Sequence, residues 1–261
     1  MKKGKVILAG AGPGDAELIT VKLQKALAWA EVIISDRLVN PEIIKQNANP
    51  QAKLVLAGKQ GFNDASLQQH EVTALIIQYA SEGKNVLRLK GGDVAFFSNV
   101  LDELEALVQH NISFEIIPGV TAASGASAYA GFPLTARGFA QGVQFITFNP
   151  NSYYSPEKWK VLATTDDTLI FYMASKNIHY LAELLLRYSR KPSTPLAVIE
   201  QATTPQQKIH ITTLQSCQQD FTGISFSSPS LVVIGEVVRL HESFNWFMAG
   251  GEGSVFEALK Q

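Results

Sequence analysis

The sequence predicts an α/β fold in two parts, the first built on a mostly parallel sheet and the second on a mixed sheet. From residue 5 to residue 130, short apolar segments alternate with segments of helical periodicity, which is typical of βαβ crossovers. In the second half, the apolar segments 196–200 and 208–212 lie too close together for a parallel crossover, so we expect an antiparallel pair. With 261 residues, 46% of them hydrophobic and 17% charged, the chain can bury a substantial core.

The elements of the first half follow from their periodicity. Alternating or continuous apolar character predicts strands at 5–9, 32–35, 53–57, 86–90 and 114–117. Helical spacing of apolar residues predicts helices at 18–30, 66–81, 100–108 and 121–130. Four of the strands run into unusual segments, namely Gly10–Asp15, Asp36-Arg37, Gly58-Lys59 and Gly91-Gly92-Asp93.

The second half begins after a break in the pattern. Residues 131–142 contain three glycines and a proline, and we place a domain boundary there, giving domains of residues 1–131 and 132–261. Beyond it we expect strands near 143–148, 168–172, 196–200, 208–212 and 230–238, with helices at 156–163 and 178–187.

Composition excludes several classes of protein. The net charge of −1 gives no basic surface for nucleic acid, and the single cysteine, Cys217, excludes an internal disulfide and a thiolate metal cluster. The five histidines lack ligand spacing, so we predict no metal. The apolar run Val6–Ala9 is too short for a signal peptide, and no window reaches 18 apolar residues. We therefore expect a cytoplasmic protein without a membrane anchor.

The unusual strand ends predict a site. In a parallel sheet they share one edge, and ligands of open α/β sheets bind outside the carboxyl ends of the strands. Gly91-Gly92 would let a ligand approach the backbone closely, or would only form a tight turn. Asp36 and Lys59 would form an acid/base pair, or a surface ion pair at two loop ends. The residues alone do not decide between a ligand site and a turn at the glycines, or between an acid/base pair and a surface ion pair.

The first glycine loop also suggests a dinucleotide, although it departs from the fingerprint. The pattern G-x-G-x-x-G requires glycine at position 15, where this chain has Asp15, and Pro13 stiffens the loop. Asp36 does end the second strand, where a ribose-binding acid would lie, so nicotinamide or flavin binding stays an alternative. Neither a P-loop nor a G-x-S-x-G elbow is present.

The motifs taken together resemble a known family. VILAGAGPGDAELITVKLQKAL, VIISDRLV, LAGK, NVLRLKGGD and IIPGVTAASGASAYAGFPLT, followed by FYMAS, PLAVIEQATTPQQ and PSLVVIGEVVRL, are similar to the uroporphyrinogen-III C-methyltransferases of the tetrapyrrole methylase superfamily. The resemblance implies two α/β domains with a cleft between them and a homodimer. It also implies transfer of methyl groups from S-adenosylmethionine to uroporphyrinogen III, which gives precorrin-2 for sirohaem and cobalamin.

The resemblance also implies a role for individual residues. Asp36 would accept a proton and Lys59 would donate one. The residues implied to bind S-adenosylmethionine are Pro13, Gly91, Gly92, Asp93, Phe96, Thr121, Ala122, Met173 and Ala202. The eight carboxylates of the macrocycle need cationic partners, for which Arg37 and Arg137 are favoured over Arg88.

The chain departs from the family where the acceptor is expected. After Gly-Gly-Asp the family continues PFxFGRGGEE, whereas this chain has VAFFSNVLD from Val94 to Asp102. The family's PLTHR has Ala136 in place of histidine, and its TGH becomes Thr147-Phe-Asn149. The cofactor side is therefore matched better than the acceptor side. Two alternatives remain: a methylase with a different precorrin-type acceptor, and a weakly active protein that binds the cofactor or a tetrapyrrole.

Overall fold

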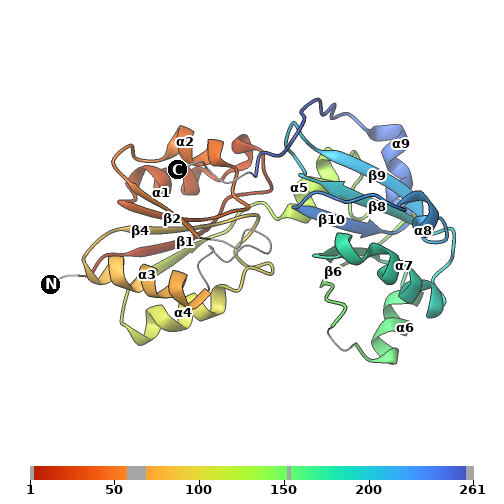
Figure 1. Ribbon diagram of the computed structural model, residues 1–261, viewed down its shortest axis with the longest axis horizontal. Helices are drawn as coiled ribbons and strands as arrows, with labels where there is room; N and C mark the ends of the chain where they lie inside the picture. The colour runs from red at the N-terminus through yellow and green to blue at the C-terminus, as the bar shows by residue number, and fades with distance from the viewer. Residues whose placement is uncertain (1–2, 58–68, 152–153, 257–261) are drawn as a thin grey trace. The chain divides into compact units, whose positions relative to one another are not determined.

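The computed structural model describes residues 3–57, 69–151 and 154–256 and confirms the predicted α/β class. Within these ranges the chain forms two compact units (Figure 1). One runs to Ala122 and also contains Val255 and Phe256, and the other comprises Ala123–Ser254. The predicted boundary after Gly131 lies nine residues further along the chain. From Ala123 on, helix α5 (Ala122–Tyr129) belongs to the second unit, where Trp246 Nε1 donates to Ala128 O at 2.8 Å and Gln207 Nε2 to Tyr129 O at 3.1 Å.

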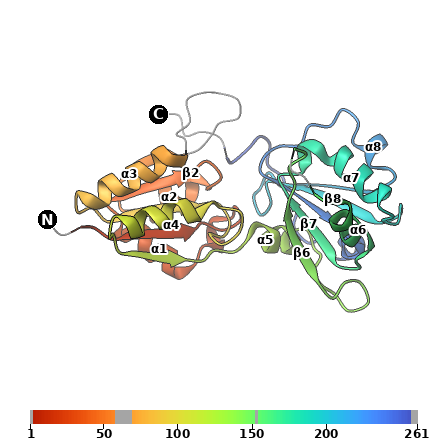
Figure 2. The same cartoon turned by 90° about the horizontal axis from the view of Figure 1, so that it is seen from below.

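The first unit is a three-layer α/β sandwich. Its sheet has the order β3-β2-β4-β1-β5, with every pair parallel. The strands are β1 (Val6–Gly10), β2 (Val32–Asp36), β3 (Lys53–Ala57), β4 (Val86–Lys90) and β5 (Phe114–Ile117). Helices α1 (Val21–Trp29) and α2 (Pro41–Asn47) cover one face, and α3 (Gln69–Ser81) and α4 (Val100–Gln109) cover the other (Figure 1). Figure 2 shows α3 and α4 side by side.

Local signals explain where these helices begin. Thr20 Oγ1 accepts from Leu23 N at 3.1 Å, so the helix expected from residue 18 starts at Val21, after a 3-10 turn at Ala16–Leu18. Helix α2 was not predicted, although Asn40 caps it and Pro41 occupies its first turn. Helix α3 is described from Gln69, and the expected start at residue 66 lies outside the described residues.

The second unit has a mixed sheet of order β6-β7-β10-β8-β9. Only β6 and β7 are parallel, and β8 pairs antiparallel with β9, as predicted. The strands are β6 (Val143–Thr147), β7 (Thr168–Tyr172), β8 (Pro195–Glu200), β9 (Lys208–Thr213) and β10 (Ser230–Ile234). The helices after α5 are α6 (Pro156–Thr164), α7 (Ile178–Arg187), α8 (Cys217–Asp220) and α9 (His241–Phe244), with 3-10 turns at Ser175–Asn177 and Glu236–Leu240.

Two details of the second unit differ from expectation. The last strand was expected to reach residue 238, but it ends at Ile234. Gly235 adopts φ 152°, and the buried residues Val237 and Val238 then lie in a 3-10 turn. Cys217 lies in a polar stretch of sequence but is buried in the core, and burial raises the pKa of its thiol to about 11. This thiol is therefore protonated and inert at neutral pH.

Across the described ranges, no helix combines the length and apolar character that crossing a membrane requires. Nor do three His, Cys, Asp or Glu side chains of these ranges come together in a way that could hold a metal ion.

The ends of β1 and β4 are packed so closely that only glycine fits at Gly10. A Cβ on Gly10 would lie 2.5 Å from Gly92 O and 2.9 Å from Gly119 N, both backbone atoms. We predict that Gly10→Ala lowers the free energy of unfolding by roughly 1–3 kcal/mol, measured by urea denaturation. Gly250→Ala is the control, because nothing lies within 4 Å of a Cβ built there. Equal stability of the two variants would contradict the packing argument.

An exposed ion cluster on the edge strand β5 predicts acid sensitivity. The ammonium groups of Lys22 and Lys5 donate to the two oxygens of Glu115 and lower the pKa of that carboxyl to about 2. Because the folded-state pKa is depressed, the stabilisation is complete above the ordinary value of 4.5 and is lost as the pH falls through about 2.

We therefore expect Glu115→Gln to have a flatter stability profile than the wild type between pH 4.5 and 2, measured by urea unfolding at low ionic strength. High salt should bring the two profiles together, because exposed pairs are screened. Parallel profiles at low salt would show that the cluster does not contribute.

Candidate functional site

The carboxyl edge of the first sheet gathers most of the predicted site. Asp36 is the last residue of β2, and its side chain is 29% exposed. It is in register with Ala57, the last residue of β3. Lys59, its predicted partner, lies outside the described residues.

The loops after β1 and β4 are joined by backbone hydrogen bonds. Gly12 N donates to Gly92 O at 3.0 Å, and Gly92 N donates to Gly12 O at 2.8 Å. A Cβ on Gly91 would lie 2.7 Å from Leu38 O, and Gly92 adopts φ +68°. Gly91 is thus required by the chain's own packing and Gly92 by its backbone conformation. A Cβ on Gly92 would still have 3.6 Å to its nearest neighbour, Ala122 N, so this glycine is not enclosed in the same way.

Asp93 links the β4 edge to the loop after β5. Its Oδ1 accepts from Ala95 N at 2.7 Å, and its Oδ2 accepts from Gly119 N at 2.7 Å. The residue is only 7% exposed. Asp93 therefore braces two loops, and each of its oxygens retains capacity for one further hydrogen bond.

Other predicted cofactor residues of this unit lie on the same edge. Pro13 is buried in the loop that Gly12 ties to Gly92. Thr121 and Ala122 are half-buried at the start of α5. Phe96 is 37% exposed in the loop between β4 and α4. That loop departs from the family pattern, and two of its residues, Phe97 and Asn99, adopt positive φ.

Asp36 has an ion-pair partner that the sequence did not indicate. Arg88 Nη2 lies 2.5 Å from Asp36 Oδ1, and the Arg88 side chain is only 3% exposed. Arg88 was considered for substrate carboxylates, but the structure places its guanidinium inside the protein. Although burial disfavours its charge, the carboxylates of Asp36 and Glu103 raise the pKa of Arg88.

Glu103 anchors this ion cluster from α4. Its Oε1 accepts from Arg88 Nε at 2.9 Å, from Lys90 Nζ at 3.1 Å and from Gln69 Nε2 at 3.2 Å. Its side chain is fully buried, and its Oε2 has no hydrogen-bond partner among the described residues. Burial, and then the charge of Arg88, lower the pKa of Lys90.

The pattern of β4 carried a signal for this cluster. Val86, Arg88 and Lys90 alternate along one face of a central strand, and Val86 packs in the core under α3 and α4. A central parallel strand is covered on both faces, so two cations on one face require buried counter-ions. A covering helix with a carboxylate on its inner face, such as Glu103 on α4, is the place to look for one.

In the second unit, the two predicted cofactor residues follow β7 and β8, the two strands that flank β10. Met173 comes directly after β7, has φ +60° and is 65% exposed. Ala202 follows β8, is 8% exposed and stands between Gln201 (φ +46°) and Thr203 (φ +67°). Left-handed backbone at residues other than glycine costs energy and is concentrated at functional sites. These two loops are therefore candidates for binding within their own unit.

The two arginines favoured for substrate lie in different units. Arg37 is half-buried next to Asp36, at the end of β2. Arg137 is exposed in the second unit, within a tight loop closed by two 3.0 Å hydrogen bonds between Ala136 and Ala140.

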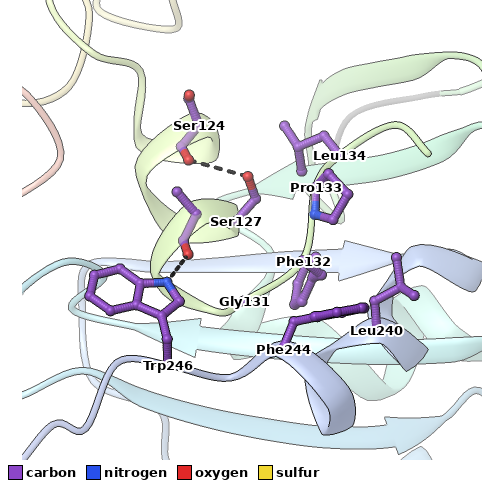
Figure 3. A pocket seen from close by; sticks show the side chains of 10 residues that line it. Ser124, Ser127, Gly131, Phe132, Pro133, Leu134, Leu240, Phe244 and Trp246 are labelled. Atoms are coloured by element: carbon purple, nitrogen blue, oxygen red, sulfur yellow. Dashed lines mark hydrogen bonds between the residues drawn. The ribbon is translucent and has the colours of Figure 1, made fainter.

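The second unit also contains an apolar groove of about 660 Å³ (Figure 3). Helix α5 contributes Ser124 and Ser127, and Trp246 lies across from them, its indole donating to Ala128 O. Pro133 and Leu134, which begin the PLTAR motif, line the groove as well. Neither Met173 nor Ala202 is among its lining residues, so the groove is separate from those loops.

Comparisons with known proteins agree with the fold and the motifs. Residues 5–218 match the model of the tetrapyrrole (corrin/porphyrin) methylases. The uroporphyrinogen-III C-methyltransferase of Bacillus subtilis is 43% identical over 246 residues, which are 94% of this chain and 95% of that protein. The siroheme synthase of Saccharophagus degradans is 38% identical over 94% of this chain and 53% of its own length. The chain thus spans about half the length of the siroheme synthases that it matches.

Solved structures show the same likeness. A uroporphyrin-III C-methyltransferase from Thermus thermophilus, solved in complex with S-adenosylhomocysteine, has a TM-score of 0.76 and 32% identity. The match covers 91% of this chain and 94% of the other. With the family motifs on the same sheet edge and these matches over nearly the whole chain, the protein belongs to the tetrapyrrole (corrin/porphyrin) methylases.

Proposed function

We propose that the chain is an S-adenosylmethionine-dependent C-methyltransferase that converts uroporphyrinogen III to precorrin-2. The observation that carries this proposal is Asp36, a partly exposed carboxylate at the carboxyl edge of the sheet, beside the loops that carry the family motifs. The relative from Bacillus subtilis supports it, because its name states this activity and the chain covers 95% of that protein.

The edge residues fit S-adenosylmethionine in their chemistry. A Cβ on Gly92 would not be crowded, and each oxygen of Asp93 can accept one more hydrogen bond. We propose Pro13, Gly91, Gly92, Asp93, Phe96, Thr121 and Ala122 as the binding residues of the first unit. Met173 and Ala202, on strained loops, carry the same proposal in the second unit.

The chemistry asks little of the protein beyond alignment and proton transfer. When bound, S-adenosylmethionine would supply an activated methyl group, since the electron pair of its C–S bond would stay on sulfur while a pyrrole carbon provides the pair for the new C–C bond. The macrocycle then carries an extra positive charge and must lose a proton. The Asp36 carboxylate is the proposed acceptor, Lys59 is the proposed donor, and Arg37 and Arg137 are proposed to pair with substrate carboxylates.

The direct test is incubation of the protein with methyl-labelled S-adenosylmethionine and uroporphyrinogen III under reducing conditions. We expect two labelled methyl groups in a product with the mass and spectrum of precorrin-2. Tight binding of S-adenosylhomocysteine in calorimetry without any labelled product would instead identify a cofactor-binding protein and refute the proposed activity.

One observation favours a second candidate function, in which the chain is a methylase of the same family that acts on a different precorrin-type acceptor. The loop from Val94 to Asn99 replaces the family's arginine and glycines, and it presents Phe96 and Phe97, both more than a third exposed. Aromatic rings in place of the arginine would change the contact with the macrocycle at this loop, as a different precorrin-type acceptor would require. A panel of reduced tetrapyrrole acceptors, compared by kcat/KM, separates the two possibilities.

The proposal includes a homodimer and a cytoplasmic location, both of which rest on the family resemblance. Sedimentation equilibrium tests the first, with twice the 28.4 kDa chain mass expected. Cell fractionation with an antibody against the chain tests the second.

A further inference from the structure

Two cations and two carboxylates form a continuous chain from the interior of the first unit to its edge. Arg88 and Lys90 project from β4 toward α4, where Glu103 receives both. Arg88 then reaches from Glu103 to Asp36, and its Nη1 also donates to Ile34 O at 3.3 Å and Leu89 O at 3.2 Å. The guanidinium is therefore fixed on several sides.

The exposure of these side chains falls steeply from the sheet edge toward the interior of the ion cluster. The Asp36 side chain is 29% exposed, that of Arg88 is 3% and that of Glu103 is 0%. Arg88 and Glu103 are fixed by the packing around them, and their contacts orient the Asp36 carboxylate. A carboxylate at a strand end has broad freedom about its last torsion, and a 2.5 Å charge-assisted bond from a fixed donor restricts it.

We infer that Arg88 is a positioning residue for Asp36, because Glu103 holds the guanidinium inside the layer between β4 and α4 while the guanidinium holds the Asp36 carboxylate at the edge. The inference rests on the proposed function only in that Asp36 is taken as the proton acceptor. Arg88 itself touches no substrate in this account. The other explanation is a purely structural ion cluster, in which Arg88 would support the fold equally well without Asp36.

A double-mutant cycle separates these explanations. Arg88→Lys keeps the charge, but one ammonium cannot reproduce the forked contacts to Asp36, Glu103 and two carbonyls. We expect R88K to lower kcat about a hundredfold with little change in KM, the scale of loss for a misplaced catalytic group. In an Asp36→Asn background the same substitution should cause no further fall in kcat, because the group it positions is already gone.

Two further variants control the cycle. Arg190→Lys changes a buried arginine of the second unit, 8% exposed, which donates to the Thr165 carbonyl oxygen, and we expect unchanged kcat. Glu103→Gln replaces R88K in the cycle if R88K does not fold, because glutamine keeps the shape of the Glu103 side chain and removes its charge. It should lower kcat less than R88K does, and again only while Asp36 is present. Calorimetry with S-adenosylhomocysteine checks that each variant retains its cofactor site.

A crystal structure of R88K gives a reading that does not depend on turnover. We expect the Asp36 carboxylate in more than one conformer, or rotated from its wild-type position. A single unchanged conformer, or a loss of kcat that is equal with and without Asp36, would overturn the inference. If the wild type transfers no methyl group to uroporphyrinogen III, the proposed function fails, and the Asp36 conformers decide the inference alone.

Discussion

Replacement of Asp36 by asparagine is expected to lower kcat by roughly 10²–10⁴-fold, because the amide cannot accept the proton that the methylated macrocycle must lose. The side chain occupies the last position of β2 and keeps its size in the variant. Binding of S-adenosylhomocysteine, measured by calorimetry, should be unchanged, since the cofactor contacts proposed in this unit come from other loops. The rate is measured with labelled methyl donor under single-turnover conditions, which isolate the chemical step.

The control for this prediction is Asp166→Asn, which changes an exposed aspartate of the second unit and should leave kcat unaltered. Thermal unfolding of both variants guards against a loss of fold, because Asp36 is also an ion-pair partner of Arg88. A stable Asp36→Asn protein with wild-type kcat would show that Asp36 serves only the ion cluster and that another group takes the proton.

The sheet edges were predictable from the sequence because they depend on local patterns. Short apolar runs that end in glycine or charged residues define the ends of β1, β2 and β4, and the parallel arrangement brings those ends to one edge. Asp36 could be placed there without knowing any tertiary contact. Its partner Arg88 could not, because the two residues are 52 apart in the sequence and meet only when β2 and β4 pair, with the guanidinium held by Glu103 of α4.

Arg88, the least favoured of the three arginines considered for substrate carboxylates, is buried for a physical reason. In a strand with one solvated face, a charged residue on the alternate face points to water, but β4 is the central strand and is buried on both faces. The reason for a glycine at position 91 was also ambiguous in the sequence. Gly91 could be explained by an approaching ligand or an approaching chain segment, and only the position of Leu38 O decides for the latter.

Glu103 is the residue whose loss should weaken the fold most. Glu103→Leu removes the acceptor that Arg88 Nε and Lys90 Nζ share. Arg88 keeps Asp36, but the buried Lys90 ammonium is left without a carboxylate partner among the described residues, so we expect a loss of about 3–5 kcal/mol in the free energy of unfolding at pH 7. Glu105→Leu on the exposed side of α4 is the matched control, expected within about 0.5 kcal/mol of the wild type. Both are measured by urea denaturation.

The pH dependence of that deficit follows from the two cations. Arg88 stays charged at all accessible pH values, whereas burial and the charge of Arg88 already lower the pKa of Lys90, so Lys90 can relieve the strain by losing its proton. A lysine with a depressed folded-state pKa binds fewer protons folded than unfolded, and stability therefore rises with pH. The deficit of Glu103→Leu should shrink as the pH rises toward the ordinary lysine range, while that of Glu105→Leu stays flat. A deficit that is independent of pH would mean that packing by the Glu103 side chain, and not its charge, holds β4 and α4 together.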